Sequence, residues 1–340
     1  MNTYFCPTTY GLSFTFSYLR PKQTFNSTMA KPSWFRQTIR GISKFLGSNT
    51  GTDASAAKPD LQKMTHPYAE KNGQLLELDV YQLATEVERK DRLAVLYFHG
   101  GGFSEGSRSE IRYVQFAEKL ARLGLVAIPC SYHLSMRGRS MSCDQQQSIK
   151  IAAFRSAAED VWSATRFVLE HAEAWGIHPE RIILAGSSAG AEAIVNAAYW
   201  KEGELGLEQR GLPAGFRYAG LLVMAGALLD INWITAENAL PSLLFHGESD
   251  PLVPYGAASH HLCKPDQPGY LPLFGAGAIA QRLKALNKPY MLVSGTEGGH
   301  GWADKPMFEH LDAIADFMGS AEKLQTFRQI EERWKWSKKI

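Results

Sequence analysis

The feature that most constrains the fold is a glycine-flanked serine between a short apolar run and an alanine-rich segment. The run is 182–184, the turn is Gly186-Ser187-Ser188-Ala189-Gly190, and residues 191–199 have helical character. A serine on a sharp strand-to-helix turn needs neighbours without side chains, because strand and helix approach each other closely there. Its hydroxyl is then exposed at the strand's C-terminal end, and the amide of Ala189 faces an oxyanion formed on it. The pattern selects Ser188 as the candidate nucleophile and makes Ser187 a spacer.

The serine turn by itself is a modest signal. In a chain with 30 glycines, the pattern arises by chance with a probability of roughly 0.2. The rest of the chain must therefore supply the other parts of a catalytic site at compatible places.

Short apolar runs alternate with helical patterns along most of the chain. The expected strands are 93–98, 125–130, 182–184, 219–224, 242–245 and 289–294, and the expected helices are 110–123, 145–174, 191–199, 277–286, 306–318 and 321–336. This alternation predicts an α/β fold with a mostly parallel sheet and helices on both faces. Asn72-Gly73 between the runs 64–70 and 74–82 predicts an N-terminal hairpin that adds an antiparallel edge. We expect the folded domain to span residues 64–340.

Residues 1–63 have a different character. Residues 33–46 carry apolar side chains at helical spacing with basic residues on other faces, which predicts an amphipathic helix that either caps the domain or lies on a membrane surface. A flexible linker is expected over residues 47–59. No Lys or Arg precedes the apolar stretch 11–18, so residues 1–28 make a poor signal peptide, and Met29 is a second candidate start.

Composition excludes several classes of function. A net charge of +2 gives no reason to expect a nucleic-acid partner, and no apolar run reaches the eighteen or so residues of a membrane span. The cysteines Cys6, Cys130, Cys143 and Cys263 lack metal-type spacing, so we expect no metal, and nothing indicates an organic cofactor.

Cysteine use also bears on location. We expect free or buried thiols in a reducing compartment, which favours the cytoplasm. Export is left open, and Cys130 and Cys143 are the expected pair in that case. Homo-oligomer formation is left open as well.

Acyl transfer by a serine needs hydrogen-bond donors for the oxyanion, a base and an acid. In a parallel sheet these groups belong in loops after the C-terminal ends of strands. The run 93–98 leads into His99-Gly100-Gly101-Gly102-Phe103, whose unobstructed amides make Gly101 and Gly102 candidate donors. The alternative is a flexible glycine loop that binds no anion. His99 is interpreted as an anchor of the loop.

The candidate acid is Asp250, which follows the expected strand 242–245 in a turn before Pro251. A turn-forming role alone is the alternative. Glu248 is the nearest competitor, and Asp230 follows an earlier strand.

The candidate base is His300, in the small-residue loop 295–302 after the last expected strand. It completes the chain order Ser, Asp, His. His178 is interpreted as part of a turn, and the pair His260-His261 as a solvated helix end instead of a metal site. Structural roles are also expected for His66, His133, His171 and His310.

Together, the glycine loop, the serine turn, His246-Gly247-Glu248-Ser249-Asp250 and Gly299-His300-Gly301 resemble the α/β-hydrolases of the esterase/lipase group. The resemblance covers roughly residues 64–318 and is to the branch with hormone-sensitive-lipase-like esterases and bacterial feruloyl and acetyl esterases. Segments 131–134 and 156–161 are similar to further family motifs, although His133 stands where the family usually has Arg.

The resemblance implies a serine carboxylic-ester hydrolase without cofactor. Ser188 would be the nucleophile, His300 the base and then the acid, and Asp250 the residue that orients His300, with Gly101, Gly102 and Ala189 as oxyanion donors. Expected substrates are small-molecule esters with short acyl chains or carbohydrate-linked acetyl or feruloyl esters. The alternatives are a non-catalytic binding protein of the same fold and an amidase or peptidase with the same triad.

Pocket residues are less well defined by the sequence. The insert 254–273 follows the acid directly, so we expect it to line the pocket and set specificity. Phe103 and Trp302 flank the glycine loop and the base; each is either a pocket residue or a packing residue.

Overall fold

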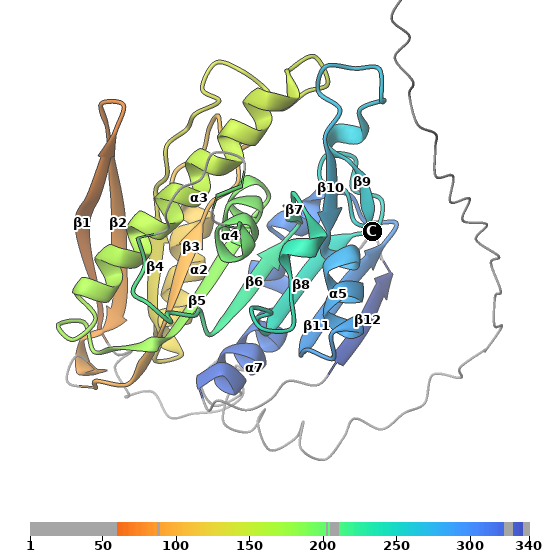
Figure 1. Ribbon diagram of the computed structural model, residues 1–340. Coiled ribbons are helices and arrows are strands. Elements are labelled where there is room, and N and C mark those ends of the chain that lie inside the picture. The colour runs from red at the N-terminus through yellow and green to blue at the C-terminus, as the bar shows by residue number, and fades with distance from the viewer. Residues whose placement is uncertain (1–59, 87–88, 202, 205–210, 323–328, 336–340) are drawn as a thin grey trace, which may run out of the picture. The chain divides into compact units, whose positions relative to one another are not determined.

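In the computed structural model, the described residues are 60–340 except 87–88, 202, 205–210, 323–328 and 336–340 (Figure 1). The expected leader, amphipathic helix and linker lie outside them, and the helix over 33–46 stays a prediction.

One sheet of nine strands runs through the described part of the chain, in the order β1-β2-β4-β3-β5-β6-β8-β11-β12. The strands are β1 Leu61–Lys71, β2 Gln74–Leu83, β3 Arg92–Phe98, β4 Val126–Cys130, β5 Ile177–Ser187, β6 Gly220–Met224, β8 Ser242–Gly247, β11 Tyr290–Thr296 and β12 Gln329–Lys335. β1 and β2 pair antiparallel, as do β2 and β4, and every pair from β4 to β12 is parallel. The expected parallel sheet with an antiparallel N-terminal hairpin is confirmed.

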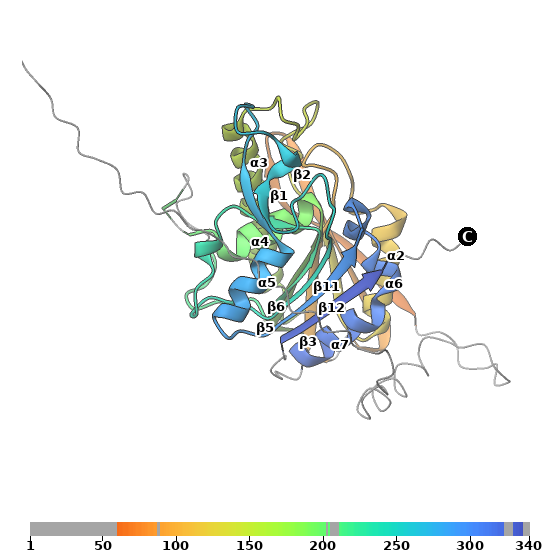
Figure 2. The same ribbon diagram turned by 90° about the vertical axis from the view of Figure 1, so that its right-hand side faces the viewer.

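Helices cover both faces of this sheet (Figures 1 and 2). They are α2 Ile111–Arg122, α3 Gln147–Glu170, α4 Ala189–Tyr199, α5 Ala276–Ala285, α6 Pro306–Glu309 and α7 Leu311–Glu322. Apolar residues of α3, α4 and α5 share one core cluster, and those of α2, α6 and α7 share the other. β3 shows why two clusters form: Leu96 and Phe98 lie in the first, and Val95 and Tyr97 in the second. Successive side chains of a strand point to opposite faces, so a strand covered on both sides is apolar throughout.

The helix expected over 321–336 is wrong in its second half. α7 ends at Glu322, and residues 329–335 form β12, which pairs in parallel with β11. β12 is an edge strand whose side chains are mostly exposed, so its sequence carries little hydrophobic pattern. Its conformation is set by the backbone partners that β11 offers, a tertiary effect that local periodicity does not record.

The insert after β8 forms part of a second, three-stranded sheet. Its strands are β7 Ala227–Leu228, β9 Ala257–Ser259 and β10 Pro272–Gly275, in the order β7-β10-β9. Between β9 and β10 lies the short 3-10 turn His260–Leu262.

A disulfide fastens this insert to the loop before α3, and it corrects the expectation for the cysteines. Cys143 is bonded to Cys263, with the Cα atoms 5.2 Å apart, and Cys130 is buried and free. Neither free thiols at 143 and 263 nor a Cys130–Cys143 pair is found. Beside the disulfide, the Nζ of Lys150 donates to the carbonyl of Gly269 over 2.8 Å. Cys143 and Cys263 are 120 residues apart in sequence, so their spacing does not indicate that they pair.

Among the described residues, no helix combines the length and the apolar character needed to cross a bilayer.

Candidate active site

Ser188 stands on a sharp turn between the end of β5 and the start of α4. Its φ of 51° and ψ of −124° are strained for a residue with a side chain. A Cβ on Gly190 would lie 2.1 Å from the carbonyl oxygen of Phe98, and one on Gly186 would lie 2.5 Å from the backbone of Gly190. Both flanking positions therefore need glycine, which explains the spacing seen in the sequence. Ser187 is buried, and its hydroxyl forms a 2.9 Å hydrogen bond with that of Tyr97.

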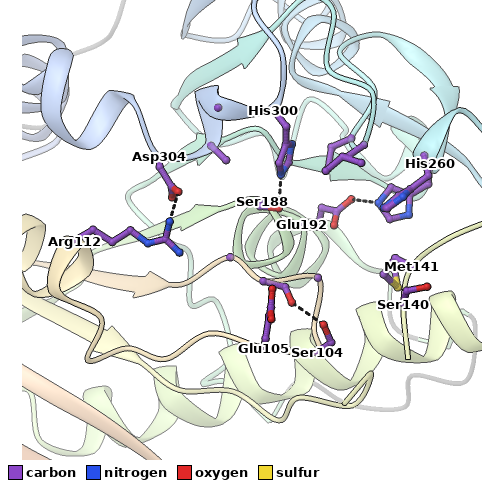
Figure 3. Close-up of a pocket in the computed structure, with 18 of the residues that line it drawn as sticks. Ser104, Glu105, Arg112, Ser140, Met141, Ser188, Glu192, His260, His300 and Asp304 are labelled. Atoms are coloured by element: carbon purple, nitrogen blue, oxygen red, sulfur yellow. Dashed lines mark hydrogen bonds and ion pairs between the residues drawn. The ribbon is translucent and has the colours of Figure 1, made fainter. Parts of the chain in front are cut away.

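The structure brings Ser188, His300 and Asp250 together. The Oγ of Ser188 lies 2.8 Å from Nε2 of His300, and Nδ1 of His300 lies 2.8 Å from Oδ2 of Asp250 (Figure 3). The side chains come from the ends of β5, β8 and β11, where parallel strands place their C-terminal loops at one edge. This is the geometry of a nucleophile, a base and an orienting acid.

Asp250 is held as a carboxylate. Its side chain is fully buried, and burial raises the pKa of a carboxyl, but hydrogen bonds from His246 and His300 outweigh burial and lower the pKa below its usual value. Its Oδ1 also accepts from the amides of Leu252 and Val253, over 2.9 and 3.1 Å.

The glycine loop lies against the serine turn. A Cβ on Gly100 would lie 3.2 Å from Cβ of Ser188. The carbonyl of Gly101 accepts from the amides of Ser104 and Glu105, over 3.0 and 3.1 Å, and Gly101 has a φ of 119° that disfavours any residue but glycine. The candidate donors Gly101 and Gly102 line the same pocket as Ser188, and Ala189 begins α4 directly after it.

His99 anchors this loop, as expected. Its Nδ1 donates to the carbonyl of Gly100 over 2.7 Å, and its own carbonyl accepts from the hydroxyl of Tyr132 over 2.9 Å. Burial lowers the pKa of His99, so its ring stays neutral.

Phe103 and Trp302 are packing residues in the structure. Phe103 is fully buried and packs edge-on against Phe154, with the ring centroids 5.4 Å apart. Trp302 is buried over the loop of His300: a Cβ on Gly295 or Gly298 would come within 2.3 Å of its indole. Neither residue is among those that line the pocket. The glycines before His300 therefore make room for Trp302.

The other candidate acids and histidines have separate partners. Glu248 pairs with Arg333, and Asp230 accepts from the amide of Asn232 in a turn. Three histidines hydrogen-bond through their rings. His178 accepts from the backbone amide of Glu180, and His171 contacts the carbonyl of Phe167. His133 contacts the side-chain amide of Asn72. The rings of the other two lie against tryptophans, His66 near Trp175 and His310 near Trp302. None of these side chains lines the pocket of Ser188.

The pocket around Ser188 has a volume of about 480 Å³. Figure 3 shows Arg112 and Asp304 on one side of Ser188, and Glu192 and His260 on the other. Arg112 and Asp304 form an ion pair with a 2.6 Å contact. The insert contributes His260 and His261 to the lining.

His260 corrects the sequence interpretation, since it is not a solvated helix end. It is 2 % exposed and lies in the pocket wall, and its Nε2 is 3.4 Å from Oε1 of Glu192. Sequence reasoning did not single out Glu192. The available signal was a lone charged residue one helical turn after Ser188, in a helix that is otherwise almost entirely apolar.

Within the described residues, no group of three or more His, Cys, Asp and Glu side chains is arranged to hold a metal ion.

A serine, histidine and aspartate at the C-terminal edge of a sheet with this strand order are the arrangement typical of the α/β-hydrolase fold. Three comparisons with known proteins agree with that fold. The BD-FAE family model matches residues 78–210, a span with the glycine loop and Ser188 but without Asp250 and His300.

Two curated relatives are esterases. Esterase B1 of Culex pipiens is 33% identical over 121 residues, which is 35% of this chain and 21% of that protein. Gut esterase 1 of Caenorhabditis briggsae is 32% identical over 120 residues, 35% of this chain and 20% of that protein. The matches thus span about a fifth of the length of these relatives.

Solved structures extend the likeness over most of the chain. Esterase 2 of Thermogutta terrifontis, phosphorylated by paraoxon, has a TM-score of 0.53 at 20% identity, over 77% of this chain and 92% of that one. An esterase from Pyrobaculum calidifontis has a TM-score of 0.51 at 17% identity, over 85% and 89%. The chain has the α/β-hydrolase fold, and the solved structures that it resembles are esterases.

Proposed function

We propose that the protein is a serine carboxylic-ester hydrolase that works through an acyl-enzyme. The observation that carries the proposal is the continuous pair of 2.8 Å contacts from Ser188 to His300 and from His300 to Asp250. The named esterases among the relatives support the same activity.

In the proposed reaction, Oγ of Ser188 attacks the ester carbonyl while Nε2 of His300 takes the hydroxyl proton. The tetrahedral intermediate collapses, the bond to the alcohol oxygen breaks, and the alcohol leaves with the proton from His300. Water then attacks the acyl-enzyme, with His300 as base again, and releases the acid and free Ser188. Asp250 holds Nδ1–H of His300 and stabilises the imidazolium in both halves.

The oxyanion of each intermediate would be stabilised by backbone amides. Gly101, Gly102 and Ala189 are the proposed donors, since the glycine loop lies against Ser188 and Ala189 opens α4. Donors fixed before reaction stabilise the developing charge without reorganisation.

Hydrolysis of short p-nitrophenyl esters tests the proposal. Ser188→Ala should lower turnover by roughly 10⁶, and Asp250→Asn by up to roughly 10⁴. The matched control is Ser187→Ala, the adjacent buried serine, which should keep most activity. Equal turnover by wild type and Ser188→Ala would rule out the assignment.

Assays on the wild-type protein also test the two alternative functions, a non-catalytic binding protein and an amidase or peptidase. Failure of wild type to react with a fluorophosphonate at Ser188 would favour a non-catalytic binding protein. Faster turnover of p-nitroacetanilide than of p-nitrophenyl acetate would favour an amidase.

For substrates, we propose short acyl chains or carbohydrate-linked acetyl or feruloyl groups. A pocket of about 480 Å³ lies toward the small end of ordinary ligand sites. An acyl-chain series with acetylated xylan and methyl ferulate measures this directly. A rate that rises steadily toward long-chain esters would contradict it.

For location, the disulfide favours an oxidising compartment over the cytoplasm. Disulfides persist outside reducing compartments, and Cys143 is bonded to Cys263. Detection of both thiols in the free form in protein from its native host would favour the cytoplasm.

A further inference from the structure

Two buried titratable side chains form one end of the pocket and have no part in the mechanism above. Glu192 lies on α4 one turn after Ser188, and His260 comes from the insert between β9 and β10. Each is 2 % exposed, and both line the pocket. Oε1 of Glu192 lies 3.4 Å from Nε2 of His260 (Figure 3).

Two polar atoms of this pair have no hydrogen-bond partner within the protein. Oε1 of Glu192 and Nδ1 of His260 are buried and make no hydrogen bond. Buried polar atoms without partners are costly, so native proteins retain few of them. Their position in the wall of the catalytic pocket indicates that a ligand supplies the missing partner.

The surroundings of the pair disfavour a charged ligand. Burial and the nearby Asp250 raise the pKa of Glu192 well above its ordinary value. Burial and the adjacent His261 lower the pKa of His260. Both shifts favour the uncharged form of the group concerned. The ammonium of Lys150 lowers the pKa of His260 further, so a substrate cation would meet a positive neighbour there.

An uncharged carboxyl and an uncharged imidazole each offer one donor and at least one acceptor. That combination matches an alcohol hydroxyl, which also donates one hydrogen bond and accepts others. The remaining lining at this end includes the apolar side chains of Met141, Leu252 and Val253. Ser140 and His261 also line the pocket, so the pair belongs to a wall of mixed polar and apolar side chains.

We propose that Glu192 and His260 form a subsite that binds a hydroxyl group of the ester substrate, so hydroxylated esters are preferred over unsubstituted ones. The inference rests on the proposed esterase function. Four residues of α4 rise about 6 Å from Ser188 to Glu192, so the hydroxyl lies a few bonds from the scissile carbonyl. It belongs either to the acyl part or to the alcohol part, and the experiment separates the two.

The test compares kcat/KM for matched ester pairs in a pH-stat. Methyl 3-hydroxybutyrate against methyl butyrate reports on the acyl part, and glyceryl monoacetate against propyl acetate on the alcohol part. Wild type should prefer the hydroxylated member of at least one pair by about tenfold or more, because a site built for a hydroxyl rejects the analogue without one. Methyl 3-aminobutyrate, which is cationic, should gain no such advantage.

Variants assign the preference to the pair. Glu192→Leu should remove it and leave hydrolysis of the unsubstituted ester, whereas Glu192→Gln should retain part of it. His260→Phe removes the other hydrogen-bonding group of the subsite, which lies in the insert and not in α4. This variant tests the same prediction if Glu192→Leu does not fold. The matched control is Glu105→Leu, which removes an exposed carboxylate from another part of the same pocket and should keep the preference.

The outcomes separate the two proposals. Ser188-dependent hydrolysis of all esters without a hydroxyl preference, or with a preference that survives both Glu192→Leu and His260→Phe, would overturn the subsite and leave the esterase function standing. A stronger preference for methyl 3-aminobutyrate would also overturn it. No Ser188-dependent hydrolysis of any ester would overturn the esterase function and the subsite with it.

Discussion

Nε2 of His246 lies 3.3 Å from Oδ2 of Asp250, and both side chains are completely buried. The same nitrogen is 3.0 Å from the carbonyl of Val253, so it carries the proton and donates toward both oxygens. Asp250 thus has two histidine neighbours: His300, which contacts Ser188, and His246, which comes from the preceding strand β8. We therefore predict that His246 acts through Asp250 as a positioning residue.

Removing that donor should weaken catalysis without abolishing it. We expect His246→Leu to lower kcat by about tenfold, which corresponds to ~1.4 kcal/mol, with little change in KM. His246→Gln, which can still donate toward Asp250, should recover part of the loss. Steady-state kinetics on a p-nitrophenyl ester measure this, with His178→Gln as a control far from the site. Identical kcat for His246→Leu and wild type would show that the contact does not position Asp250.

Asp250 should make stability depend on acid pH. Its pKa is lower in the folded protein than in the unfolded chain. The stabilisation it gives is therefore complete above the unfolded pKa near ~4, and it is lost as pH falls from there through the folded pKa. At pH 7 we expect Asp250→Asn to reduce the free energy of unfolding by roughly 2–3 kcal/mol. Urea unfolding from pH 7 to pH 3 should show that gap narrowing, and a constant gap would contradict the explanation by hydrogen bonds to the carboxylate.

Glu192 should change the pH dependence of stability in the opposite direction to Asp250. Its pKa is raised in the folded protein, so folding favours its protonated form. The cost is absent below the unfolded pKa near ~4.3 and grows as pH rises toward the folded pKa. Glu192→Gln should therefore raise the melting temperature at pH 8 by about 2–4 °C for each kcal/mol relieved, and by much less at pH 4. Glu105→Gln, at an exposed carboxylate, should show no such trend. Equal increases at both pH values would indicate a packing effect instead.

The disulfide should stabilise the folded protein substantially. Because Cys143 and Cys263 are 120 residues apart, the bond restricts a long loop of the unfolded chain, and we expect its loss to cost ~2–4 kcal/mol. Denaturant unfolding with and without a phosphine reductant gives the difference. Cys143→Ser is the control, since the reductant should not destabilise it further. An unchanged midpoint in reduced wild type would argue against this contribution.

The serine turn should tolerate no side chain at Gly190. A Cβ there would meet the carbonyl oxygens of Phe98 and His99 at 2.1 and 2.5 Å, and backbone atoms of a central strand cannot easily move. We expect Gly190→Ala to cost more than ~3 kcal/mol and to abolish activity. The matched control is Gly319→Ala, where nothing lies within 4 Å and a helix gains ~1 kcal/mol from the change. Thermal melts and ester hydrolysis of both variants test the contrast.

The parts of the site that the sequence could predict are those with local patterns. Ser188, Asp250 and His300 each follow a short apolar strand in a turn of small residues, so strand ends and chain order were sufficient to select them. The glycine loop was selected for the same reason. The fold followed from alternating strands and helices, because a parallel sheet leaves a strong hydrophobic pattern.

What the sequence could not supply depends on residues far apart in the chain. The Cys143–Cys263 bond and the Glu192–His260 contact each join the insert to a distant segment of the chain. These segments come together only when the insert has folded. The position of Trp302 follows from its packing over Gly295 and Gly298, which converts a candidate pocket residue into a core residue. β12 was missed because a polar edge strand depends on its neighbour for its conformation.

The small sheet β7-β10-β9 has a consequence for how proteins of this architecture can diversify. The proposed reacting groups lie in loops after β5, β8 and β11 of the main sheet, whereas His260 and His261 belong to the insert. Substitutions between β9 and β10 therefore reshape one wall of the pocket while the frame that holds the triad stays intact. Substrate range and chemical competence are separable traits in this architecture, and selection can alter the first without risking the second.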